Sequence, residues 1–157
     1  MTTISHAIEN STFVPVRNQK ENCDFNQAQF RGRVGRIWAL ITGGSNHILD
    51  VETIKAGRSL CRSRYVGSTI VDIRQIKGSE GRCQDFDKNF NPLKSHNRDR
   101  WVSISNAYRQ GVSLPAVDLI KIGNSYIVRD GHHRISVAKF IGIDFVDAHV
   151  TEWILGD

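Results

Sequence analysis

Apolar residues in the first third of the chain recur every three or four positions between residues 30 and 41. This spacing predicts an amphipathic helix that ends at Gly43-Gly44, and Asp24 or Asn26 is expected to cap its start. We refer to the apolar positions as the apolar stripe, which consists of Phe30, Val34, Ile37, Trp38 and Ile41. The sequence predicts that the apolar stripe packs against the rest of the protein.

Residues 50–65 follow with a different pattern. Asp50 is expected to cap a short second helix that runs through Lys55. The stretch 58–65 alternates arginine with small residues and is interpreted as a basic connector.

The pattern from residue 66 onward is that of a mixed α/β domain. Short β-branched runs predict strands, and apolar spacing near 3.6 predicts helices. We expect strands over 69–76, 114–122, 126–129 and 145–150, and helices over 101–108 and 135–141. Gly123-Asn124 is expected to join two of these strands as a hairpin. The predicted fold is a small mixed sheet with packed helices (residues 66–157), preceded by a basic, partly helical N-terminal extension (residues 1–65).

Charge and composition narrow the function classes. The net charge is +5, and residues 1–65 carry nine Lys/Arg against five Asp/Glu, an excess of four. Nucleic acid, if bound, is therefore expected at Arg31, Arg33, Arg36, Arg58, Arg62 and Arg64. No apolar run approaches the ~20 residues of a membrane span, and the N-terminus lacks a secretory pattern, so a cytoplasmic protein without membrane contact is expected. The three cysteines predict neither disulfides nor a zinc site.

The strongest chemical motif is Asp130-Gly-His-His-Arg134, at the point where a predicted strand becomes a helix. A helix N-terminus offers unpaired N–H groups and partial positive charge, which suit a phosphate. Gly131 permits close approach, and His133 and Arg134 can donate to phosphate oxygens. Asp130 could hold magnesium or orient a histidine. Alternatively, Asp-Gly is an ordinary turn, and Asp130 only caps the helix.

Residues 126–138 resemble the signature of the ParB/sulfiredoxin-like superfamily, in its Asp-Gly-His-His-Arg branch. The resemblance covers roughly residues 66–153 and implies a nucleotide ligand (ATP, ADP or CTP) with magnesium. Sulfiredoxin-type proteins carry a catalytic cysteine where this chain has His132, so reduction of a sulfinic acid is not expected. Partition proteins carry Gly-Glu-Arg-Arg in place of residues 131–134, and the chain ends before their helical DNA-reading domain.

The loop Gly78-Ser-Glu-Gly-Arg82 lies beside this turn in the resembling fold, although it could equally be a solvated turn. Glu80 is then a candidate general base. The catalytic candidates are Asp130, Glu80 and His132, with Asp130 also the metal candidate, and the phosphate-binding candidates are Gly131, His133, Arg134, Ser79 and Arg82. The favoured function is a nucleotide-binding, magnesium-dependent phosphotransferase or nucleotide hydrolase. The alternatives are a non-catalytic nucleic-acid-binding or regulatory module and, third, a nuclease.

Overall fold

The protein is described by a computed structural model over residues 19–156. One six-stranded mixed sheet has the order β1-β3-β5-β4-β6-β2. Its strands are β1 (Leu49–Asp50), β2 (Ser59–Asp72), β3 (Ile76–Ser79), β4 (Val117–Ile122), β5 (Ser125–Asp130) and β6 (Phe145–Gly156). The central strands β3 and β5 run parallel, as do β4 and β6, whereas β4–β5 and β2–β6 are antiparallel pairs.

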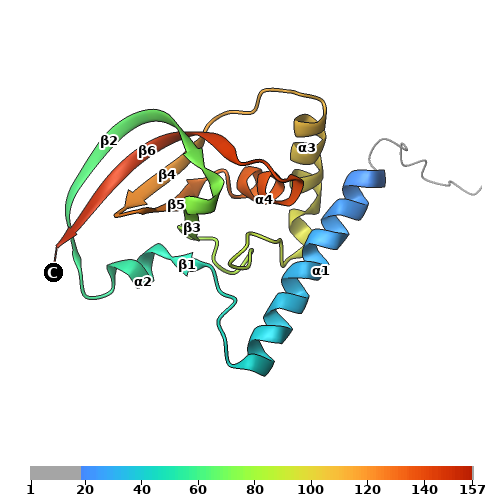
Figure 1. The fold of residues 1–157 in the computed structure, drawn as a ribbon, viewed down its shortest axis with the longest axis horizontal. Coiled ribbons are helices and arrows are strands. Elements are labelled where there is room, and N and C mark those ends of the chain that lie inside the picture. The colour runs from blue at the N-terminus through green and yellow to red at the C-terminus, as the bar shows by residue number, and fades with distance from the viewer. Residues whose placement is uncertain (1–18, 157) are drawn as a thin grey trace, which may run out of the picture.

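Helices cover the sheet mainly at one side (Figure 1). The helices are α1 (Gln19–Thr42), α2 (Val51–Lys55), α3 (Arg98–Arg109) and α4 (His132–Ile141), with short 3-10 turns at Ile73–Gln75 and Ser95–Asn97. Trp101 of α3 is fully buried between Phe25 of α1 and Phe140 of α4, with ring centroids 5.7 and 5.4 Å away. The mixed α/β class predicted from the sequence is confirmed.

The centre of the sheet is buried on both faces. Val117, Leu119 and Val128 pack toward α4 with Ile135 and Ala138, in the larger core cluster. Ile120 and Ile127, which are neighbours along the same strands, point the other way and cluster with Val51 of α2 and Trp153 of β6. This alternation separates side chains that are adjacent in sequence onto opposite faces.

Several predicted elements are found where the sequence placed them. Asp50 caps α2, accepting a hydrogen bond from the backbone of Glu52. The helices predicted over 101–108 and 135–141 are α3 and α4, and β4 and β5 form the expected hairpin around Gly123.

The predicted strand 69–76 is wrong in its extent, because the chain turns in its middle. The Asp72 carboxylate accepts a hydrogen bond from the backbone N–H of Arg74, which closes the 3-10 turn there. The segment before the turn belongs to β2 at one edge of the sheet, and β3 begins after it near the other edge. The basic connector predicted over 58–65 is also wrong. Residues 59–72 form one strand paired with β6, so the predicted boundary at 65/66 falls inside β2.

The first helix differs from prediction in both its start and its buried face. It already includes Gln19, so Asp24 and Asn26 lie inside it and contact Arg109 and Arg98 of α3 instead of capping. The buried residues of α1 are Glu21, Phe25, Ala28, Gln29 and Gly32, on the side opposite the apolar stripe. The apolar stripe is exposed to solvent. Within the described residues, no helix has the length and apolar character needed to cross a membrane.

Candidate functional site

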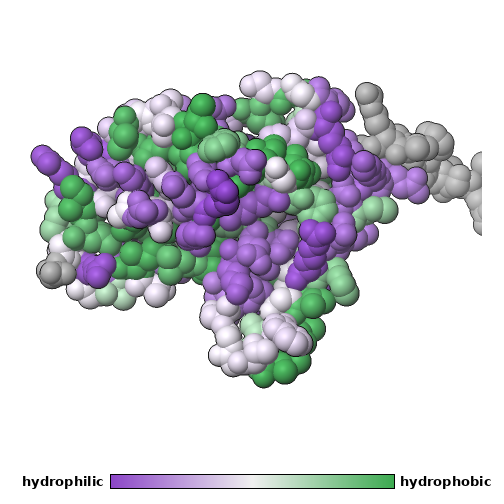
Figure 2. Space-filling view, in the orientation of Figure 1, coloured by the Kyte–Doolittle hydropathy of each residue, from purple (hydrophilic) through white to green (hydrophobic). Residues whose placement is uncertain are grey.

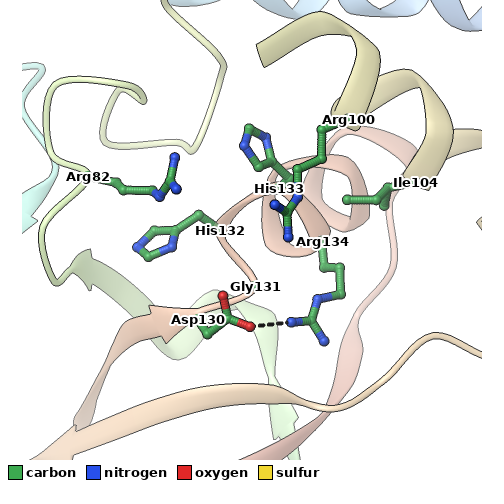
Figure 3. A pocket seen from close by; sticks show the side chains of 8 residues that line it. All are labelled: Arg82, Arg100, Ile104, Asp130, Gly131, His132, His133 and Arg134. Carbon is green, nitrogen blue, oxygen red and sulfur yellow. Dashed lines mark hydrogen bonds and ion pairs between the residues drawn. The ribbon is translucent and has the colours of Figure 1, made fainter. Parts of the chain in front are cut away.

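The motif that begins α4 forms one wall of a small pocket (Figure 3). The pocket encloses about 40 Å³. It is lined by Arg82 from the loop after β3, Arg100 and Ile104 from α3, and Asp130, Gly131, His132, His133 and Arg134 at the β5–α4 junction. Five of these eight residues are basic types, and one is acidic. The structure therefore brings Arg82 and the motif together, as the sequence predicted.

Gly131 is required at this junction by backbone shape and packing. Its φ of 93° lies in the left-handed region, and a Cβ there would approach the Val117 side chain to 2.5 Å. The sequence suggested that Gly131 permits close approach of a ligand. The structure instead shows Gly131 packed closely against Val117. Gly131 is the N-cap of α4, and no side chain caps the helix among residues 19–156. The first N–H groups of α4 are left available to a ligand in the pocket.

His132 is buried and held from two sides. One ring nitrogen, Nε2, is 2.8 Å from the Ser79 hydroxyl, and the ring stacks on Phe86 at 6.2 Å. Ser79 is itself fully buried, so it positions His132 instead of meeting solvent. Burial, reinforced by the nearby Arg82 charge, lowers the pKa of His132 to about 4. A neutral imidazole with this pKa is a weak proton acceptor at neutral pH, which argues against His132 as a general base.

His133 lines the pocket and has an unmet hydrogen-bonding group. Its side chain is 6% exposed, and its Nδ1 atom has no hydrogen-bond partner among the described residues. The ring meets Phe86 edge-on at 5.3 Å. Burial, then the charges of Arg100 and Arg82, lowers the pKa of His133 to about 4. A buried nitrogen without a partner costs stability, so a ligand or water that supplied one would be held there.

The two arginines that face the histidines carry positive charge that is only partly neutralised. Arg82 contacts the Asp85 carboxylate at 3.3 Å, and Asp85 is shared with Lys94. Arg100 has no hydrogen bond or ion pair within residues 19–156 and remains exposed beside His133. The pocket is therefore an electropositive site at a helix N-terminus, which is the environment that an anion requires.

Arg134 is more deeply engaged in the fold than the sequence suggested. Its guanidinium donates to the backbone oxygens of Pro115 and Ala116, at 2.5 and 2.7 Å, and to the Asp130 carboxylate at 2.7 Å. Among residues 19–156, Asp130 is the one carboxylate that lines the pocket. Magnesium prefers several oxygen ligands, whereas this donor set is one ion-paired carboxylate among cations, so it does not fit a resident magnesium ion. Among the described residues, no group of three or more His, Cys, Asp or Glu side chains could hold a metal.

Glu80 is not brought to the pocket. Its carboxylate accepts a hydrogen bond from Arg129 at 3.0 Å, and the Arg129 guanidinium lies 5.4 Å above the Trp153 ring. Trp153 belongs to the cluster on the face of the sheet opposite α4. Although Glu80 is two positions from Arg82 in sequence, the two side chains serve opposite faces. This placement does not support Glu80 as a general base acting on a phosphate held at α4.

The predicted nucleic-acid residues are not gathered into one surface. Arg31, Arg33 and Arg36 lie on α1, whereas Arg62 and Arg64 lie on β2, at the far side of the molecule from α1 (Figure 1). Arg58 directly precedes β2 in the sequence. Arg64 is paired with Glu152 at 2.8 Å, and Arg31 lies 5.3 Å from the Phe140 ring. The ion pair reduces the charge that Arg64 can offer to a phosphate backbone, and the ring contact reduces the reach of Arg31.

Sequence reasoning missed two residues that shape the site. Arg100 directly precedes the helix predicted over 101–108 but lies inside α3, and the packing of α3 against α4 places it at the pocket. Phe86 lies in a stretch without regular spacing, yet it is fully buried between the two histidines. Its loop is fixed by Asp87, whose carboxylate accepts hydrogen bonds from Asn89, Asn91 and Asn46. In the sequence, the one sign of an ordered loop was that Phe86 is followed by Asp and Asn residues, whose side chains commonly hydrogen-bond to nearby backbone.

Comparisons with known proteins give one structural likeness. No protein family model matches the chain, and no curated protein matches it. Among solved structures, the chain is similar to a sulfiredoxin from Arabidopsis thaliana, with a TM-score of 0.41 and 13% sequence identity, over 53% of this chain and 82% of that chain.

Proposed function

We propose that the pocket at the start of α4 binds a phosphate group of a nucleotide. The observation that carries this proposal is the buried Nδ1 of His133, which has no partner among the described residues and lies beside the unpaired Arg100. The uncapped N-terminus of α4 adds N–H donors on the same side. The nucleotide, as opposed to another phosphate compound, comes from the resemblance of residues 126–138 to a nucleotide-using superfamily.

The size of the pocket limits what it can recognise. A single water needs about 10–15 Å³ of such space, so about 40 Å³ suits a phosphate group but not a ribose and a base as well. The sugar and base would then lie on the surface outside the pocket. We therefore expect ATP, ADP and CTP to bind with similar affinity, because the buried contacts read only the phosphate.

Binding is better supported than phosphoryl transfer. A transferase needs a base for the acceptor and a carboxylate for metal. Of the three catalytic candidates, Glu80 lies on the other face of the sheet, Asp130 is paired with Arg134, and His132 is a weak base. A nucleotide-responsive binding module is thus the function that the geometry supports best.

Isothermal titration calorimetry with inorganic phosphate, ADP, ATP and CTP, with and without magnesium, tests the proposal. Arg100→Gln removes a cation that has no partner among residues 19–156, so the fold should survive while phosphate affinity falls ten-fold or more. Arg129→Gln is the matched control, because it removes the same charge from the opposite face. Absence of binding to every anion, or equal binding by the Arg100 variant and the parent, would overturn the phosphate site. Turnover of any nucleotide would contradict a binding-only role.

A further inference from the structure

The apolar stripe of α1 faces solvent along the C-terminal half of the helix. The exposed fractions are 67% for Phe30, 44% for Val34, 58% for Ile37, 66% for Trp38 and 72% for Ile41, and the neighbouring Leu40 is 84% exposed. α1 extends beyond the body of the protein at this end, and apolar surface gathers on the protruding part (Figures 1 and 2). Contiguous apolar surface of this kind ordinarily marks an interface.

The stripe is separate from the face that attaches α1 to the body. Phe25 and Ala28 pack with Trp101 and Val137, and Gly32 lies against the loop at 91–93, where a Cβ would come within 3.1 Å of two side chains. At 100° per residue, these buried positions lie on the side of the helix opposite the stripe. The body therefore leaves the stripe open to a second partner, and none of residues 19–156 covers it.

The spacing of the stripe is that of a coiled-coil seam. Phe30, Val34, Ile37 and Ile41 follow each other at intervals of four, three and four residues, which places them at successive d, a, d and a positions of a heptad. The two a positions are occupied by the β-branched residues Val34 and Ile41, and the two d positions by Phe30 and Ile37. Such a seam is complementary to another helix with the same spacing, and a second copy of this chain supplies one.

We propose that α1 pairs antiparallel with α1 of a second copy through the apolar stripe, and so forms a two-fold symmetric dimer. In this register Val34 meets Ile37 of the second copy, and Phe30 meets its Ile41. The antiparallel arrangement places the two bodies toward opposite ends of the helix pair. A parallel arrangement would bring both bodies to the same end.

The available area is close to what a stable dimer needs. Taking about 200 Å² for a large side chain, the six exposed residues present on the order of 700–800 Å² per chain. A standard stable interface buries about 800 Å² on each partner. Burial of the stripe together with Leu40 therefore approaches the usual size, without any further contact between the bodies.

The arginines on α1 are compatible with this pairing and disfavour a lipid surface. Arg31 turns toward Phe140, away from the seam. Arg33 flanks the seam at a g position, where charged residues are common, and it would face Leu40 of the second copy. If the same face were inserted into a membrane, Arg33 would be carried into the apolar layer, since it lies between Ile37 and Leu40 around the helix.

Sedimentation velocity of the full chain tests the proposal. The 17.7 kDa chain should sediment as a dimer, and Ile37→Asp should reduce it to a monomer, with association at least 100-fold weaker. Ile37 is exposed, so this variant should keep the parent's circular dichroism spectrum. Ile70→Asp is the control, because Ile70 is also exposed, at 69%, but lies on β2, and this variant should remain dimeric.

A second variant fixes the orientation. Leu40→Glu would face Arg33 of the second copy in the antiparallel pair, so the dimer should persist at low salt and weaken as salt is raised. Loss of the Leu40→Glu dimer at every salt concentration would overturn the antiparallel register. A parent that is monomeric at 100 μM, or a dimer that survives Ile37→Asp, would overturn the interface. A monomer that binds vesicles of anionic lipid through the stripe, or a stripe occupied by residues 1–18, would likewise contradict it.

Discussion

Arg129 and Arg100 lie on opposite faces of the sheet and differ in whether residues 19–156 supply an ion-pair partner. On the face away from α4, Arg129 is held by Glu80 and lies over Trp153. On the α4 face, Arg100 and the Nδ1 of His133 have no partner among residues 19–156. The first arrangement is complete as a structural element, whereas the second is the one that we propose an anion completes. Residue type alone does not define a site, and the difference lies in which polar groups the fold leaves unsatisfied.

Acid should destabilise the α4 face more than any single substitution. His132 and His133 have pKa values of about 4 in the folded protein, below the value near 6.5 of an unfolded histidine. The unfolded chain therefore binds more protons below pH 6.5, and stability is fully present above that pH and is lost as pH falls toward 4. Between pH 7 and pH 5 the loss should be roughly 2 kcal/mol per histidine.

Urea unfolding at pH 7, 6 and 5 measures this loss. Asp72, Asp85 and Glu152 stay ionised in this pH range, because hydrogen-bonded or ion-paired partners lower the pKa of each carboxyl group. His133→Phe should show a shallower pH dependence, because one buried imidazole fewer titrates. Arg129→Gln should keep the parent's dependence, since it changes the other face. A stability that is flat between pH 7 and 5 would show that the two histidines are not buried as neutral groups.

Gly131→Ala should cost about 3 kcal/mol of unfolding free energy. The left-handed backbone accounts for ~1–2 kcal/mol, and displacement of Val117 by the new methyl group adds a similar amount. Gly123→Ala is the matched control, because Gly123 also has a positive φ but a methyl group added there would meet nothing within 4 Å, so only about 1 kcal/mol should be lost. Equal losses in chemical denaturation would show that Val117 does not confine the junction.

The two ion-paired arginines should differ in their contribution to stability. Arg134→Ala removes three hydrogen bonds from a side chain that is 12% exposed, and should cost about 2 kcal/mol. Arg129→Ala breaks a pair that is 41% exposed, and should cost less than about 1 kcal/mol. Thermal unfolding of both variants measures the difference. If Arg134→Ala were as mild as Arg129→Ala, the bonds to Pro115 and Ala116 would not brace the start of β4.

Glu80→Gln should have the smallest effect. The change keeps the shape of a partly exposed side chain on the face away from the pocket, so phosphate affinity should stay within two-fold of the parent. Calorimetry with inorganic phosphate measures it. A ten-fold change in either direction would place Glu80 in the site and restore it as a catalytic candidate.

The sequence predicted the fold class and the strand–turn–helix at Asp130–Arg134, because apolar periodicity and Asp-Gly punctuation are local signals. It could not predict which face of α1 would be buried, since that helix has apolar residues on two sides. Tertiary packing selected Phe25 and Ala28 and left Trp38 outside. Pattern alone assigns an apolar stripe to the core of its own chain, and for α1 that assignment is wrong because the opposite side of the helix packs against the body.

The site was predicted in part for a related reason. Arg82 and the motif came together because both follow adjacent parallel strands, β3 and β5. Glu80 was misplaced because one residue's shift along an extended chain changes the face to which a side chain points. Arg100 was missed because its position depends on the packing of α3 against α4, which no local pattern contains.

Side-chain NMR of the imidazole nitrogens during a phosphate titration tests the central claim most directly. If phosphate binds beside His133, the ring ¹⁵N signals of His133 should shift at pH 7, and its pKa should rise from about 4, because an anion stabilises the imidazolium. His149, which lies on β6 and contacts Ser68, should not respond. His133 signals that stay unchanged at phosphate concentrations that saturate calorimetric binding would contradict the account.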